Sequence, residues 1–170
     1  MPAVLRIVDA VSVFLFWLAC LLVAAIVLIV TYDIFSRNLG LPTAVWAVNT
    51  VEYAMLHITF LCLPYLVQTR GHVCVEVLLT FLPRKVRKSW EFALHVLSAL
   101  ICFYLCWKSG ESFFRVLSDG SYEVRSFDAP MWTLYASMPL GFGIGGLQFI
   151  AFLIRGQSFF GAAPEAHAGV

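Results

Sequence analysis

The stretch that decides the fold is residues 11–30, VSVFLFWLACLLVAAIVLIV, in which no residue is charged. An α-helix rises about 1.5 Å per residue, so this stretch can cross the roughly 30 Å hydrocarbon core of a bilayer. It is longer than the apolar part of a cleavable signal peptide, which has about 7–15 residues, and no small-residue cleavage site follows it. It therefore predicts a permanent transmembrane helix.

Three further stretches have the same character: Val48–Val67 (interrupted only by Glu52 and His57), Phe92–Trp107 (with His95 inside) and Trp132–Ile154. The chain is 61% hydrophobic and 12% charged, whereas a soluble domain is under about half apolar. We predict an all-α membrane protein, a single domain of four transmembrane helices. The helices are expected at about residues 11–36, 47–68, 87–117 and 132–154, and a disordered tail at 156–170.

Charged pairs indicate that two of these helices continue past the bilayer. Arg37 follows Asp33 by four residues and Arg115 follows Glu111 by four, and side chains at this spacing share a helix face. The first helix is expected to reach about Arg37. The third is expected to project by a few turns, until Asp119-Gly120-Ser121 breaks it.

The segment 71–83, between the second and third spans, has an amphipathic pattern. Its polar residues recur every four positions at His72, Glu76 and Thr80, and its apolar ones at Val73, Val77 and Phe81. We predict a short interfacial helix at the membrane surface, ended by Pro83. Cys74 would point away from His72 and Glu76, so no metal site is predicted.

The distribution of Lys and Arg predicts the orientation. With both termini in the cytoplasm, seven of the eleven basic residues lie on the cytoplasmic side, including the cluster at 84–88. Cytoplasmic loops carry the excess of Lys and Arg, so we expect this orientation. The net charge is only +1 and there is no basic stripe, so a nucleic-acid partner is not expected.

Glu52 is the most informative single residue, because a carboxylate in hydrocarbon costs roughly 2.5–3.5 kcal/mol on insertion scales. It is expected one turn inside the second span, near Arg37 at the end of the first, and we predict that the two pair. A structural pair or partner contact is favoured over a proton or ion site. His57 and His95 lie in antiparallel spans and leave open a second hypothesis, axial ligation of a haem iron.

The fourth span contains Pro139 and the spacing Gly141-x-x-x-Gly145, which lets another backbone approach closely. Such spacing also arises by chance. Pro64 and Pro139 are each expected to kink their helices. No nucleophile–base pair, phosphate loop or zinc motif is present, so an enzyme is not predicted.

Several short motifs together resemble a known family. They are Tyr32-Asp33-Ile34-Phe35-Ser36-Arg37, then Pro42, Trp46 and Glu52, then Arg70-Gly71-His72-Val73-Cys74-Val75-Glu76 with Pro83, and finally Pro130-Met131-Trp132 and Pro139-Leu140-Gly141. Their order resembles that of the small membrane subunit, of DctQ type, of tripartite ATP-independent periplasmic (TRAP) transporters. Glu76 stands where the family more often has Asp. The resemblance covers almost all of residues 5–155.

The resemblance implies a function. In this family a periplasmic binding protein delivers a small solute, often a carboxylate, to a large multi-span subunit. That subunit imports the solute by a sodium-driven elevator motion, and the small subunit is part of its fixed scaffold in the bacterial inner membrane. No cofactor is then expected in this chain, sodium is expected at the large subunit, and lipids are expected at the interface. The structural or partner contacts would be Arg37, Glu52, Arg70, His72, Glu76, Trp132, Pro139, Gly141 and Gly145.

The alternatives come from other classes. A membrane anchor for b-type haem or quinone would use His57 and His95. A small multidrug exporter would hold its essential carboxylate in the first span, which has none. A membrane enzyme would need polar groups converging at one depth, and none are predicted.

Overall fold

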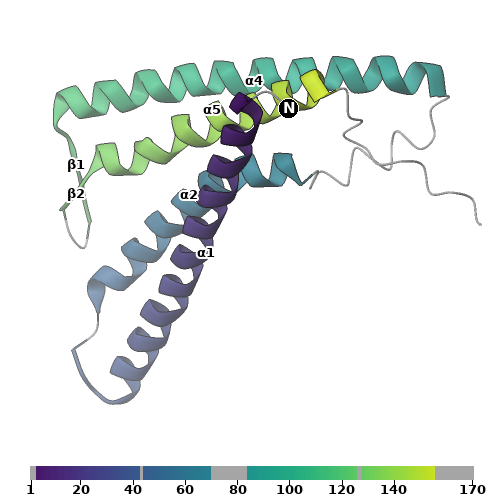
Figure 1. Cartoon of the computed structure of the whole chain (residues 1–170). Coiled ribbons are helices and arrows are strands. Elements are labelled where there is room, and N and C mark those ends of the chain that lie inside the picture. The colour runs from purple at the N-terminus through teal and green to yellow at the C-terminus, as the bar shows by residue number, and fades with distance from the viewer. Residues whose placement is uncertain (1–2, 43, 70–83, 126–127, 156–170) are drawn as a thin grey trace, which may run out of the picture.

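The computed structural model describes residues 3–42, 44–69, 84–125 and 128–155, with only the backbone for residues 84–88 and 91. The elements follow in the order α1 (Ala3–Asn38), α2 (Val45–Gln68), α4 (Arg84–Asp119), β1 (Tyr122–Val124), β2 (Asp128–Pro130) and α5 (Met131–Arg155). The helix α1 lies beside α2 as one antiparallel pair, α4 lies beside α5 as another, and the two pairs diverge into an open V (Figure 1).

Each of the four described helices is long and apolar enough to cross a membrane, which confirms the predicted all-helical fold with four spans. The predicted interfacial helix at 71–83 and the tail at 156–170 lie outside the described residues. We call the side with the α1–α2 turn and the β1–β2 hairpin the hairpin side. The opposite side, where α1 begins and α5 ends, is the terminal side (Figure 1).

Two glycines end the long helices on the hairpin side. Gly40 has a φ of 69°, and the backbone N–H of Leu41 donates to the Ser36 carbonyl at 3.0 Å while that of Gly40 donates to the Arg37 carbonyl at 3.3 Å. This pair of bonds is a Schellman motif, in which a left-handed residue closes the helix. Gly120, with a φ of 58°, follows the last residue of α4. Both helices therefore end close to the predicted positions, and at about 54 Å each is longer than a bilayer core is thick.

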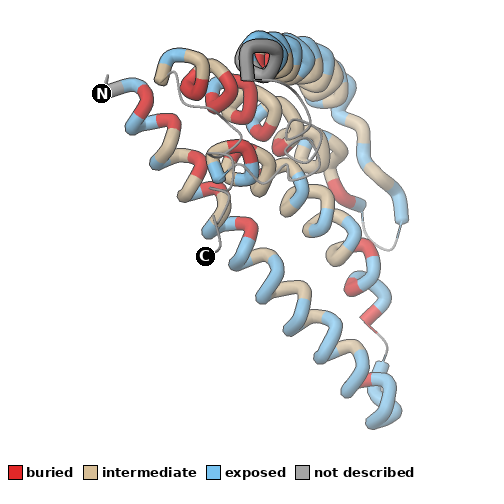
Figure 2. The backbone as a smooth tube through the Cα atoms, turned by 90° about the vertical axis from the view of Figure 1, so that its right-hand side faces the viewer, coloured by how far each residue is buried: buried red, intermediate tan, exposed pale blue. Residues whose placement is uncertain are grey.

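The helix α5 forms the centre of the bundle, because it packs against α4, α2 and α1. In its most apolar window 44% of residues are buried, compared with 11–17% in the other three spans. The buried stripe of α1 is Leu5, Val8, Ser12, Leu15 and Ala19. Its three- and four-residue steps keep it on one helix face. Beyond Ala19, α1 has no buried residue before Ser36 (Figure 2).

The antiparallel hairpin between α4 and α5 is an element that the sequence did not predict. Tyr122 pairs with Pro130 and Val124 with Asp128, and the backbone N–H of Met131 donates to the Ser121 carbonyl at 3.0 Å. The hairpin thereby leads the chain directly from the end of α4 into the first turn of α5.

Candidate functional site

Glu52 projects from α2 on the hairpin side and binds the β1–β2 hairpin. Its carboxylate accepts a hydrogen bond from Arg125 Nη1 at 2.7 Å, and Arg125 Nε also donates to Glu123 at 3.0 Å. The two carboxylates, Glu123 first, raise the pKa of Arg125 above its ordinary value. The side chains of Arg125 and Glu52 are 50% and 52% exposed, so the contact is a half-solvated link and not a buried charge.

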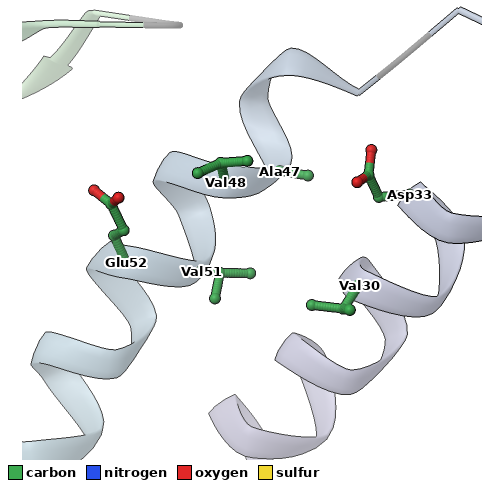
Figure 3. A pocket seen from close by; sticks show the side chains of 6 residues that line it. All are labelled: Val30, Asp33, Ala47, Val48, Val51 and Glu52. Carbon is green, nitrogen blue, oxygen red and sulfur yellow. The ribbon is translucent and has the colours of Figure 1, made fainter. Parts of the chain in front are cut away.

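The predicted pairing of Arg37 with Glu52 is wrong. Arg37 Nε instead donates to Asp33 Oδ2 at 2.9 Å, one turn back on its own helix. The physical reason is direction, because Glu52 projects from the side of α2 that faces away from α1 (Figure 3). Arg37 thus stabilises the end of α1, and the partner of Glu52 comes from a part of the chain 73 residues away.

A cavity of about 230 Å³ separates α1 from α2 near this end and is lined by Val30, Asp33, Ala47, Val48, Val51 and Glu52 (Figure 3). Its walls are mainly valine. Asp33 Oδ1 is buried there without a hydrogen-bond partner. In the described part of the chain no three His, Cys, Asp or Glu side chains gather closely enough to hold a metal ion.

A polar cluster on the terminal side joins the first and last helices. Asp9 Oδ2 accepts from Arg155 Nη2 at 2.6 Å. Gln148, which is fully buried, donates to Ser12 Oγ at 2.8 Å and to Asp9 Oδ1 at 3.3 Å. The sequence analysis missed this cluster, although two signals were present. Gln148 is the one side-chain amide in the last span, and Asp9 is the one acid in the first thirty residues.

The glycines of α5 pack against helices of the same chain. A Cβ built on Gly141 would meet the backbone carbonyl of Phe60 on α2, and one on Gly145 would meet Leu63 of the same helix. A Cβ built on Gly143 would instead lie 3.3 Å from Cys106 Sγ, and one on Gly146 would lie 3.3 Å from Cys102 Cβ, both on α4. The prediction of close packing at Gly141 and Gly145 is correct, and the helix that approaches them is α2 of the same chain.

The two membrane histidines lie far apart along α5. His57 is near its first turn, with Nε2 at 3.0 Å from the Thr133 carbonyl and Nδ1 at 2.7 Å from the Tyr53 carbonyl. His95 packs against Phe149 and Phe152 near its last turns. At the helical rise, Thr133 and Phe149 are about 24 Å apart. One haem iron cannot bind both histidines, so the geometry gives the haem hypothesis no support.

The other predicted contact residues divide into two groups. Trp132 is 42% exposed in the first turn of α5, a position typical of interfacial anchors. The carbonyl of Pro139 accepts a hydrogen bond from the Cys106 thiol at 3.3 Å, so Pro139 lies inside the α4–α5 contact. Arg70, His72 and Glu76 lie outside the described residues.

The fold and these contacts define an integral membrane protein whose four described helices are joined by polar links between its own elements. Comparison with known families gives a more specific result. Residues 26–158 match the model of the family described as "Tripartite ATP-independent periplasmic transporters, DctQ component". The chain belongs to this family, and is the small permease component of a TRAP transporter and not a member of an enzyme family. No curated protein and no solved structure matches it.

Proposed function

We propose that this chain is a fixed scaffold that binds and supports a large sodium-coupled elevator subunit. The large subunit imports a small solute, of carboxylate type, that a periplasmic binding protein delivers. The chain itself contributes no transport pathway, binds no cofactor and leaves sodium binding to the large subunit. Family membership supports the scaffold role. The uncharged interior of the bundle supports the assignment of transport to the large subunit.

The observation that carries the proposal is the absence of charge from the middle of the bundle. In the described spans no Asp, Glu, Lys or Arg occurs at 10–32, 53–68, 92–107 or 131–154. Secondary transporters hold their substrate and ion sites near the bilayer midplane, on polar groups of interrupted helices. Here the glycines of α5 instead pack closely against α2 and α4.

The surface of the bundle suits a permanent membrane partner. Beyond Ala19, α1 has no buried residue before Ser36 and exposes large apolar side chains such as Leu21, Leu28 and Phe35. We propose that the large subunit and the surrounding lipid contact two surfaces of this chain. One is the part of α1 after Ala19, and the other is the face of α4 that includes Tyr104 and Trp107. Arg70, His72 and Glu76, in the most family-like motif, are proposed as further contacts.

The proposal includes a location and an orientation. The chain is placed in the bacterial inner membrane as one multi-pass domain, with both termini in the cytoplasm. The basic residues at 84–88 support this orientation, because α4 begins on the terminal side. The β1–β2 hairpin would then face the periplasm.

Reconstitution in liposomes tests the proposal. The chain is inserted alone, then with the large subunit, and then with the binding protein, a sodium gradient and a panel of radiolabelled carboxylates. Uptake is expected only in the complete system, and the chain should co-purify with the large subunit. Uptake by the chain alone, or a large subunit that is fully active without it, would overturn the proposed scaffold role.

A further inference from the structure

The β1–β2 hairpin has one face turned to the bundle and one turned to solvent. Side chains alternate across a strand, and directly paired residues share a face. The inner face contains Ala129, which is only 5% exposed. By the strand register, the outer face consists of Tyr122, Val124, Asp128 and Pro130. On this face Tyr122 is 60% exposed and Val124 is 77% exposed, so two large apolar side chains lie open to solvent.

The hairpin is fixed in place by the chain itself. Arg125, which follows β1, binds Glu52 of α2 at 2.7 Å, and the backbone N–H of Met131 donates to the Ser121 carbonyl at 3.0 Å. A surface that is already ordered loses little conformational entropy when a partner binds. The outer face is therefore ready to bind without rearrangement.

The hairpin lies beyond the lipid. The apolar stretch of α4 begins at Phe92, and twenty helical residues from there, which are enough to cross the hydrocarbon core, end at Glu111. The exposed pair that Glu111 forms with Arg115 fits this exit from the membrane. Residues 112–119 then carry α4 about 12 Å further, whereas a headgroup layer is about 5–8 Å thick. The hairpin at the end of α4 is thus surrounded by water (Figure 1).

The hairpin and the residue that precedes its turn have net negative charge. Residues 119–131 contain Asp119, Glu123 and Asp128 but a single basic residue, Arg125, which is already bound to Glu123 and Glu52. Asp119 and Asp128 are exposed, and neither has an ion-pair partner within the part of the chain that the structure describes. Such a surface repels anionic headgroups and attracts a basic protein surface.

We propose that the outer face of the hairpin is the docking surface for the periplasmic binding protein. The inference rests on the proposed function, which supplies a soluble partner on this side of the membrane. Tyr122 and Val124 are the apolar contacts, and tyrosine is among the side chains enriched in the energetically important part of interfaces. Asp128 lies beside them and attracts Lys and Arg side chains of the binding protein, which speeds association.

Solute uptake by the complete complex tests the docking surface. The small and large subunits are reconstituted in liposomes with a sodium gradient, and uptake is measured against the concentration of the binding protein. Val124→Lys places a cation in the apolar contact and should raise the concentration for half-maximal uptake by about tenfold or more, as for loss of a central interface residue. The maximal rate should stay unchanged. Asp128→Asn should raise the same concentration by about two- to fivefold at low salt, and by less at high salt.

Leu41→Lys is the matched control, because it adds the same charge at an exposed apolar residue of the α1–α2 turn on the same side. Its uptake curve should match the wild type. Identical curves for Val124→Lys and wild type would overturn the docking surface and leave the scaffold role intact. Loss of the large subunit from the purified Val124→Lys complex would also overturn it, since the hairpin would then contact that subunit. Absence of uptake by the complete wild-type complex would overturn the proposed function and the docking surface with it.

Discussion

Gly141 of α5 lies directly against the backbone carbonyl of Phe60 on α2. Pro64, inside α2, has no N–H to give to that carbonyl. This contact between the two helices therefore falls where the α2 ladder lacks one hydrogen bond, and only the absence of a side chain at 141 allows it. A Cβ there would lie 3.0 Å from the Phe60 Cβ and closer still to the carbonyl oxygen.

The first prediction compares three glycine-to-alanine changes in the chain without any partner. Gly141→Ala should lower the free energy of unfolding by about 1–3 kcal/mol, because backbone must move. Gly145→Ala meets only the end of the flexible Leu63 side chain and should cost less than about 1.5 kcal/mol, the range of a shifted rotamer. Gly110→Ala has open space around it and should stabilise by up to about 1 kcal/mol. Thermal unfolding of the detergent-purified variants measures all three, and equal losses at 141 and 145 would contradict the packing.

The second prediction concerns the link between the first and last helices. Arg155→Gln removes the bond to Asp9. The side chains of Arg155 and Asp9 are only 13% and 28% exposed. The loss should be about 1.5–3 kcal/mol, as for a hydrogen bond to a charged group. Arg115→Gln is the matched control, because the Arg115–Glu111 pair is exposed and should contribute less than about 1 kcal/mol. If both variants melt at the same temperature, the Asp9 cluster does not hold α1 to α5.

Hydrophobic run length was sufficient to predict the four spans, because a bilayer admits few other structures for a chain of this composition. It was not sufficient to predict which helix face packs inside. Lipid-facing and buried faces are both apolar, so the sequence around Gly141 and Gly145 did not distinguish α2 from another subunit.

The partner of Glu52 was unpredictable for a different reason. Local pairs such as Asp33–Arg37 follow from helical spacing, and both this pair and Glu111–Arg115 form at the predicted spacing. The Arg125–Glu52 contact instead depends on a hairpin with two strands of three residues each. Strands this short carry almost no periodic signal, so their register cannot be read from the sequence.

The third prediction concerns His57, which lies between the carbonyls of Tyr53 and Thr133. His57→Phe keeps a ring of similar size but removes the cross-helix bond, and should lower stability by about 1 kcal/mol. Thr59→Val, two residues later on α2, removes only a bond to the same helix and should be nearly neutral. The purified wild type should show no Soret band. A Soret band that His57→Phe abolishes would restore the haem hypothesis.

The last prediction tests the charge pairs on the hairpin side. If Arg125 holds Glu52, removing either one already breaks the contact, so the double change should cost less than the sum of the single changes. Because both side chains are half exposed, the coupling between Glu52→Gln and Arg125→Gln should be about 0.2–1 kcal/mol and should fall with added salt. The losses from Glu52→Gln and Arg37→Gln should instead be additive, since Arg37 is bound to Asp33.

Hydrogen exchange gives an independent measurement of the same contact. Glu52→Gln removes one contact that holds the hairpin and should speed exchange of the backbone amides at 122–130. Arg37→Gln should not change that exchange. Coupling of Glu52 to Arg37 together with unchanged exchange in the hairpin would assign Glu52 to the end of α1 and refute the contact with Arg125.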